Sequence, residues 1–328
     1  MEIEKSLENK KKKRFLVIDG NALIHRAYHG LPPLTTKKGE LVNAVYGFLL
    51  VFLKALKQFQ PDYVAAVFDF PGPTFRHKEF KDYKAKRPKA PDELYEQIPR
   101  IKQILRAFNV PIFEKQGFEA DDIIGTISSQ APQKQIYPDI ETIIITGDLD
   151  ALQLVNKNTK VFIPRRGLKD TILYDQEKVK ERYQGIRPEQ LADLKGLKGD
   201  PSDNIPGVLG IGEKTAIALI KEFGSLENLY NELDKKTERA EKIKPSLRQK
   251  LIEYREQAFF SKMLTDIKCN APIDFNLKDC QWKGLDKVKA INALKRFEFH
   301  SIIKRLLTQN RQNKESNDND NIHNRRLF

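Results

Sequence analysis

Phe15-Leu-Val-Ile18 runs directly into Asp19, and a short apolar run followed by acid recurs twice further along the chain. The later runs are Tyr63-Val-Ala-Ala-Val-Phe68, followed by Asp69, and Thr142-Ile-Ile-Ile-Thr146, followed by Gly147-Asp148-Leu149-Asp150. Near-continuous apolar runs of this length are typical of parallel strands buried on both faces. Stretches with helical periodicity separate them, at residues 43–58, 91–108 and 121–130. This alternation predicts βαβ units and an α/β fold.

Acidic residues follow each of these strands, and Glu119-Ala-Asp121-Asp122 stands where the third helical stretch begins. Any one of these acids alone would fit a turn or a helix N-cap. Ligand sites form beyond the carboxyl ends of parallel strands, however, so we expect the acids to converge there. Convergent carboxylates repel unless cations hold them together, and oxygen ligands suit Mg²⁺ or Mn²⁺. Two such ions ~4 Å apart would stabilise the attacking and leaving oxygens of a phosphodiester.

The charge balance favours a polyanionic partner. The chain has 328 residues, with 58 Lys and Arg against 45 Asp and Glu, a net charge of +13 and a pI near 9.4. Neutralised phosphates release counterions and strengthen binding, although a lysine-rich surface on an ordinary protein gives the same composition. Cys269 and Cys280 fit neither a disulfide framework nor a zinc site. Residues 45–53 are too few to span a bilayer and no signal-peptide pattern opens the chain, so we expect a cytoplasmic protein.

Residues 75–89 (FRHKEFKDYKAKRPK) form a basic, aromatic stretch with seven Lys or Arg and only two acids. On a helix, Arg76, Phe80 and Lys84 would recur at i,i+4. Basic side chains on such a face grip phosphates, while an aromatic ring stacks on an unpaired base. A solvated basic face with two aromatic anchors explains the stretch equally well by itself. Because the stretch closely follows the second strand, we expect it to lie over the acids.

Gly207-Val-Leu-Gly-Ile-Gly-Glu-Lys-Thr215 is a glycine-rich turn that leads into an apolar-periodic helix. A turn of this kind exposes backbone N–H groups to an anion such as a DNA phosphate. It resembles the helix–hairpin–helix element, which grips the backbone without reading sequence, whereas its spacing excludes a Walker A loop. Asp200 and Asp203 stand just upstream. Asp-Pro and Gly-rich turns are also common in ordinary loops. Here, however, one segment combines acids that suit a metal with a turn that suits a phosphate.

Together these motifs resemble the 5′-nuclease (flap endonuclease) family, in the form of the 5′-3′ exonuclease domain of bacterial DNA polymerase I. The similarity extends from about residue 14 to 307, with several long motifs in the family's order. Those motifs are VIDGN (17–21), VFDF (67–70), DYKAKRP (82–88), EADDIIGT (119–126), ITGDLDALQLV (145–155), LKGDPSDNIPGVLGIGEKTA (197–216) and FEFHSIIKRL (297–306).

The resemblance implies which residues form the site. The metal ligands would be Asp19, Asp69, Glu119, Asp121 and Asp122 in one cluster and Asp148, Asp150, Asp200 and Asp203 in the other, with Asp121 between them. The catalytic clamp would consist of Lys84 and Arg87 on the scissile phosphate and Tyr83 stacked on a nucleotide. Phosphate contacts are expected from Arg26 and Arg76. Duplex DNA, and a K⁺ ion, would be bound at the hairpin through Gly207, Gly210, Gly212, Lys214 and Thr215.

The resemblance also implies an α/β, PIN-like nuclease domain with a mainly parallel central sheet, followed by a helical helix–hairpin–helix (helix–three-turn–helix) region. The expected division is a disordered tail at 1–13, a nuclease domain at 14–175 with a helical arch near 75–95, a helical DNA-binding region at 176–307 with its hairpin at 207–215, and a disordered tail at 308–328. Because the nuclease pattern closes near residue 307, we expect either a stand-alone nuclease or a domain cut from a polymerase.

The expected function is two-metal-ion hydrolysis of DNA and RNA-primer phosphodiesters, as a 5′-3′ exonuclease and structure-specific 5′-flap endonuclease in primer removal and repair. Its partners would be branched, nicked or flapped DNA and a separate DNA polymerase, for a monomeric, nucleoid-associated bacterial protein. One alternative is a PIN-type ribonuclease with the same sheet and acids, which the duplex-type hairpin disfavours. Another is a non-catalytic clamp for branched DNA, which predicts missing acids where none is missing. A basic structural protein leaves the ordered acids unexplained.

Overall fold

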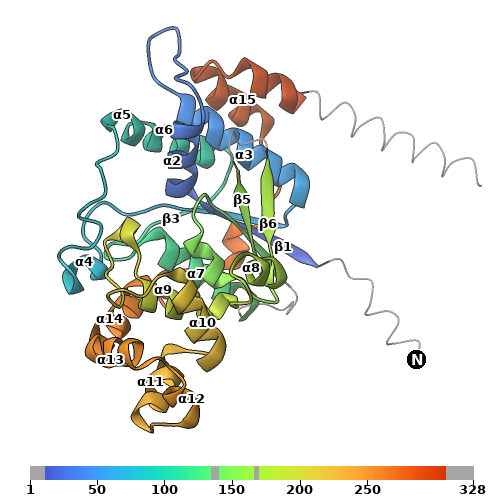
Figure 1. Ribbon diagram of the computed structural model, residues 1–328. Coiled ribbons are helices and arrows are strands. Elements are labelled where there is room, and N and C mark those ends of the chain that lie inside the picture. The colour runs from blue at the N-terminus through green and yellow to red at the C-terminus, as the bar shows by residue number, and fades with distance from the viewer. Residues whose placement is uncertain (1–11, 134–139, 166–169, 308–328) are drawn as a thin grey trace, which may run out of the picture.

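A computed structural model describes residues 12–133, 140–165 and 170–307 of the chain (Figure 1). The two tails expected at 1–13 and 308–328 lie outside the described residues, except for Lys12 and Lys13, and Lys13 already begins the first strand. Within the described ranges, no helix combines the length and apolar character that a membrane crossing needs.

The centre of the molecule is a six-stranded sheet in the order β3-β2-β1-β4-β5-β6. Its strands are β1 (Lys13–Asp19), β2 (Tyr63–Val67), β3 (Ile112–Phe113), β4 (Ile140–Ile145), β5 (Thr159–Pro164) and β6 (Thr171–Tyr174). The central strand β1 pairs in parallel with β2 and β4, and only the edge strand β6 runs antiparallel, against β5. The mainly parallel α/β fold predicted from the sequence is therefore confirmed.

Both faces of the sheet are covered, because successive side chains on a strand point to opposite sides. On one face, Leu16 and Ile18 join a buried cluster with α2 (Gly20–Gly30), α3 (Asn43–Phe59) and α6 (Gln97–Ala107). On the other, Phe15 and Val17 pack in a second cluster with α7 (Ala120–Gln133) and the helices that follow the sheet. Figure 1 shows these helices on either side of the strands. Burial on both faces explains the uninterrupted apolar runs.

Helices dominate after the sheet. They are α8 (Gln176–Arg182), α9 (Leu191–Lys198), α10 (Glu213–Phe223), α11 (Leu226–Asp234), α12 (Glu238–Glu241), α13 (Pro245–Glu253), α14 (Arg255–Thr265) and α15 (Lys287–Arg296), with short 3₁₀ turns η1 (Asp150–Leu154), η2 (Pro188–Gln190), η3 (Pro201–Asp203) and η4 (Leu277–Cys280). Helix α15 returns to the first face of the sheet, where Ala290 and Leu294 are buried with α3 and α6. The division at residues 175 and 176 remains a proposal.

The helical arch expected near 75–95 is not one continuous helix. Helix α4 (Phe75–Glu79) is short, Phe80 is extended with φ −139°, and α5 (Asp92–Tyr95) starts only later. Lys84 has φ 58°, in the left-handed region, so it cannot continue a helix begun by Arg76 and Phe80. Long-range docking decides this conformation, because Lys84 N–H donates to the Asp203 carbonyl at 2.9 Å. We call residues 80–89 the clamp segment.

Candidate active site

A cavity of about 930 Å³ lies where the parallel strands end. Its wall includes residues from the ends of β1, β2 and β4, from the start of α7 and from η3, as the strand-end argument predicted. The predicted acids that line it are Asp19, Asp69, Glu119, Asp121, Asp148, Asp150 and Asp203. Segments far apart in the chain thus deliver carboxylates to one place.

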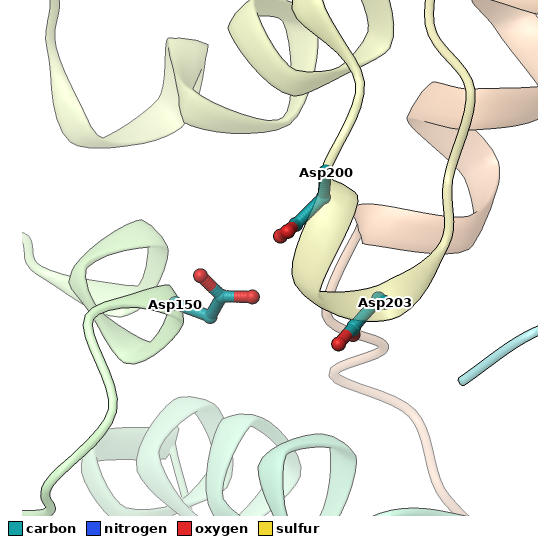
Figure 2. Close-up of side chains that lie close together, drawn as sticks. All are labelled: Asp150, Asp200 and Asp203. Carbon is teal, nitrogen blue, oxygen red and sulfur yellow. The ribbon is translucent and has the colours of Figure 1, made fainter. Parts of the chain in front are cut away.

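Asp150, Asp200 and Asp203 form a compact group within this site. One carboxylate oxygen from each lies within 4.8 Å of the others. Figure 2 shows the side chain of Asp150, at the start of η1, pointing toward Asp200 and Asp203 of the η3 segment. Asp150 and Asp203 line the cavity, and Asp200 does not. The donors are all carboxylate oxygens, the set that Mg²⁺ and Mn²⁺ prefer. The group therefore fits a divalent cation.

The acids at the strand ends are fixed by bonds that also shape the fold. Asp19 caps α2 by accepting from the Ala22 N–H at 3.0 Å, and its other oxygen accepts from Thr146 Oγ1 at 2.6 Å. Asp69 accepts from the Ala120 N–H at 2.8 Å, at the start of α7. A role as helix cap and a role as cation ligand are therefore compatible for these acids, because the capping bonds hold the carboxylates at the cavity wall.

Burial and mutual repulsion raise the pKa values of several of these acids, so their carboxyls keep their protons to higher pH than free carboxyls do. Burial, with further repulsion from Asp69 and Asp148, raises the pKa of Asp19 to about 7. Burial and the neighbouring Asp148 raise the pKa of Asp121 well above its ordinary value, and burial raises the pKa of Asp69, which is open to water but lies in the concave wall. Burial also raises the pKa of Asp150 to about 6. Such shifts mark a site that needs added positive charge.

Lys195, on α9, is a site residue that the sequence did not reveal. Its ammonium bonds Asp150 and also Asp200, the latter at 2.6 Å. Burial alone would raise the pKa of Asp200, but Lys195 outweighs it and lowers that pKa to about 2. The one available signal was the position of Lys195 five residues before Asp200.

The basic residues of the clamp segment reach the acids directly. Lys84 Nζ lies 2.8 Å from Glu119 Oε1, and Arg87 pairs with Asp203. Both line the cavity, where a phosphate would meet their charges. Their predicted placement beside the acids agrees with this geometry, and their catalytic role stays a proposal.

Tyr83 requires a correction. Its ring is only 3% exposed and packs against Ile205 and Leu264. Its hydroxyl donates to Glu119 Oε2 at 3.1 Å and to Asp203 Oδ2 at 3.2 Å. A ring held in this way cannot stack on a nucleotide; Tyr83 instead fixes the clamp segment over the acids.

Arg76 and Asp122 also differ from expectation, because they pair with each other. The guanidinium and the carboxylate form two parallel bonds of 2.7 and 2.8 Å, with Arg76 2% and Asp122 0% exposed. Asp122 does not line the cavity. Arg76 does line the cavity, but its N–H groups are taken up by Asp122 and by two backbone carbonyls at the end of α14. This geometry disfavours Asp122 as a metal ligand and Arg76 as a phosphate contact.

Helix α2 contributes another part of the cavity wall. Arg26 lines the cavity there, in keeping with its predicted phosphate contact, together with His25 and His29. The histidines were not predicted, although their i,i+4 spacing on a helix was a visible signal.

The hairpin residues do not line the cavity; Gly210, Gly212 and Lys214 are exposed, Thr215 is partly exposed and Gly207 is buried. Gly207 has φ 63°, and a Cβ there would lie 2.2 Å from the Gly199 nitrogen, so only glycine fits. Helix α10 begins after Gly212, and Lys214 is exposed in its first turn. The sequence argument did not single out Lys250, on α13. Its ammonium lies beside Gly210, so close that a Cβ added at this glycine would be 2.7 Å from it.

The raised pKa values predict how stability depends on pH without metal. Carboxyls such as Asp19 and Asp150 bind protons more tightly in the folded chain than in the unfolded chain, so their stabilisation is present at low pH and lost as pH rises through about 6 and 7. In EDTA, the melting temperature should therefore fall between pH 5 and 8, and Asp19→Asn should make the fall shallower. An equal slope in wild type and variant would contradict this. Asp200, with its pKa of about 2, titrates outside this window.

A carboxylate-lined cavity at the carboxyl edge of a parallel sheet, with basic side chains over it, defines the chain as a nuclease of the α/β class. Residues 14–184 match the family described as 5′-3′ exonuclease, N-terminal resolvase-like domain, and residues 186–288 match the 5′-3′ exonuclease, C-terminal SAM fold. The chain belongs to the 5′-3′ exonuclease family.

Relatives and solved structures agree with this placement. The chain is 45% identical to DNA polymerase I of Caldicellulosiruptor bescii over 295 residues. The matched region covers 89% of this chain and 33% of that protein. It is 41% identical to DNA polymerase I of Bacillus caldotenax, over 90% of this chain and 32% of that protein. The chain thus spans about a third of the length of these relatives. A crystal structure of the T5 D15 protein co-crystallised with metal ions shares the fold, with a TM-score of 0.64 at 20% identity, covering 87% of this chain and 100% of that one.

Proposed function

We propose that the chain hydrolyses phosphodiesters near the 5′ end of flapped or nicked DNA, and of RNA primers, with two divalent cations. The observation that supports this most strongly is the convergence of carboxylates from separate strands and turns in one cavity, with Asp150, Asp200 and Asp203 close enough to share an ion. The ions would be Mg²⁺ or Mn²⁺, which activate water and neutralise charge on the phosphate.

The chain's own residues would do the rest by binding and orientation. Asp19, Asp69, Glu119 and Asp121 would hold one ion, and Asp148 with the Asp150 group would hold the other. Lys84 and Arg87 stand at the cavity wall and would turn from Glu119 and Asp203 to the phosphate oxygens. Positioned cations aimed at developing charge are among the strongest contributions to catalysis.

The hairpin surface supports a duplex substrate. The N–H groups at the start of α10, beside exposed Lys214, suit the phosphates of a DNA strand, and a K⁺ ion on the hairpin carbonyls belongs to the same proposal. Contacts of this kind position the duplex without reading its sequence, so a free 5′ end and DNA bending would select the cut. The protein would act as a monomer in the bacterial cytoplasm, at the nucleoid, alongside a DNA polymerase, in primer removal and repair.

Replacing Lys214 should weaken duplex binding without affecting the chemistry. Because each neutralised phosphate releases counterions, Lys214→Ala should lower the slope of log affinity against log salt by about 0.9. Affinity for a nicked duplex, measured by fluorescence anisotropy in EDTA at several salt concentrations, gives the slope. Lys221→Ala, exposed on the same helix at its far end, is the matched control. Equal slopes for both variants would remove Lys214 from the DNA surface.

A substrate comparison separates the proposal from a PIN-type ribonuclease. With Mg²⁺, we expect labelled 5′-flap DNA to be cut near the junction, while single-stranded RNA of the flap sequence is cut far more slowly. The opposite preference would favour the ribonuclease.

A further inference from the structure

The buried pair of Arg76 and Asp122 connects three parts of the molecule. Arg76 belongs to α4, which leads into the clamp segment, and Asp122 to the first turn of α7, directly after Glu119. Arg76 also donates from Nε to the Leu264 carbonyl at 2.8 Å and from Nη2 to the Asp266 carbonyl at 2.9 Å, at the end of α14. One guanidinium therefore ties the base of the clamp segment to the acidic turn and to the helical region.

Asp122 has no oxygen lone pair left for a cation. Its Oδ1 accepts from Arg76 and from the Lys268 N–H at 2.9 Å, and its Oδ2 accepts from Arg76 and from the Glu119 N–H at 3.1 Å. A carboxylate offers about four acceptor sites, and all of them are used. The bond to the Glu119 N–H is the half of a capping box in which the third helical residue reaches back to the residue before the helix. Asp122 thus fixes the backbone of Glu119.

Arg76 acts on the side chain of the same residue. The guanidinium Nη1 lies 3.5 Å from Glu119 Oε2, while its other N–H groups bond Asp122 and the α14 carbonyls. Glu119 otherwise bonds Tyr83 and Lys84, both in the clamp segment. The backbone of Glu119 is held by Asp122, and its carboxylate oxygen Oε2 is held by Arg76 together with Tyr83.

We propose that Arg76 and Asp122 are a positioning pair that sets the carboxylate of Glu119 for cation binding, and that neither contacts cation or DNA. This rests on the proposed function, because it assigns Glu119 to the ion site. The inference differs from what the resemblance implies, where Asp122 is a ligand and Arg76 a phosphate contact. Groups that orient a metal ligand commonly change metal affinity or turnover 10- to 100-fold when they are replaced.

Arg76→Lys tests the pair while keeping the charge. A lysine cannot form the two parallel bonds, so Glu119 should lose its fixed position. We expect Mn²⁺ affinity, measured by calorimetry on the protein without DNA, to fall about tenfold. Flap cleavage should show kcat lowered about 10- to 100-fold, with KM and the affinity for flap DNA in EDTA unchanged. Asp122→Asn should behave in the same way.

The Glu119→Gln background makes the test specific. If the pair works through Glu119, Arg76→Lys should reduce Mn²⁺ affinity no further once that carboxylate is gone, because effects within one unit are not additive. A weaker DNA affinity and a salt slope lowered by about 1 would instead make Arg76 a phosphate contact and overturn the proposal. A lower melting temperature with unchanged Mn²⁺ affinity and kcat would also overturn it, as a merely structural pair.

Failure of the proposed function is distinguishable from failure of this inference. Wild type that binds Mn²⁺ but cuts no flap would remove the nuclease proposal, while the calorimetric comparison of wild type with Arg76→Lys and Asp122→Asn would still decide whether the pair positions Glu119.

Discussion

Asp150→Ala should lower the rate of flap cleavage about a thousandfold, the factor that corresponds to ~4 kcal/mol of lost transition-state stabilisation. Asp150 would share the proposed ion site with Asp200 and Asp203, and no other carboxylate of the described residues completes that group. Single-turnover cleavage of a labelled flap in Mg²⁺ measures the loss. The variant should still fold, because removal of one of several repelling carboxylates relieves strain in the metal-free site.

Asp170→Ala is the control for this substitution, since the Asp170 side chain is 68% exposed directly before β6. It should cleave at the wild-type rate. If Asp150→Ala retained more than about a tenth of wild-type activity, the assignment of a second ion to this group would be wrong.

Arg76→Ala should have the largest effect on stability. Removing one partner of a buried ion pair leaves an uncompensated charge, and such losses amount to about 3–5 kcal/mol. Here the remaining charge is Asp122, which is 0% exposed, and the carbonyls of Leu264 and Asp266 also lose their donor. Urea unfolding in EDTA, followed by circular dichroism, gives the free energy of unfolding.

The exposed pair of Lys89 and Asp92 provides the comparison, because their side chains are 76% and 77% exposed. Solvent-screened pairs contribute little, so Lys89→Ala should leave the unfolding midpoint unchanged. Similar small effects for Arg76→Ala and Lys89→Ala would mean that the buried pair does not hold the fold together.

The sheet and the meeting of the acids could be predicted from the sequence because both depend on local pattern. The run Phe15–Ile18 is apolar at every position because the strand is buried on both faces, and Asp19 follows where a parallel strand ends. The strands β3, β5 and β6 lack such long runs, so they were not anticipated.

The errors came from contacts between distant segments. The basic stretch has helical spacing, but docking of Tyr83 and Lys84 against Glu119 and Asp203 breaks the helix. Asp121 and Asp122 are neighbours in the sequence, yet successive helical residues point about 100° apart, so one faces the cavity and the other Arg76. The sequence alone does not show which of the two acids faces the cavity, because Arg76, the partner of Asp122, lies 46 residues away.

Cleavage of a 5′-labelled flap duplex by the wild-type chain, in Mg²⁺ and in EDTA, tests the central claim most directly, with Asp148→Ala run beside it. We predict cutting near the junction that requires the metal and is abolished by the substitution, because Asp148 lines the cavity among the convergent carboxylates. Tight flap binding with no cleavage in either Mg²⁺ or Mn²⁺ would contradict the proposed nuclease activity and leave a clamp for branched DNA as the better account.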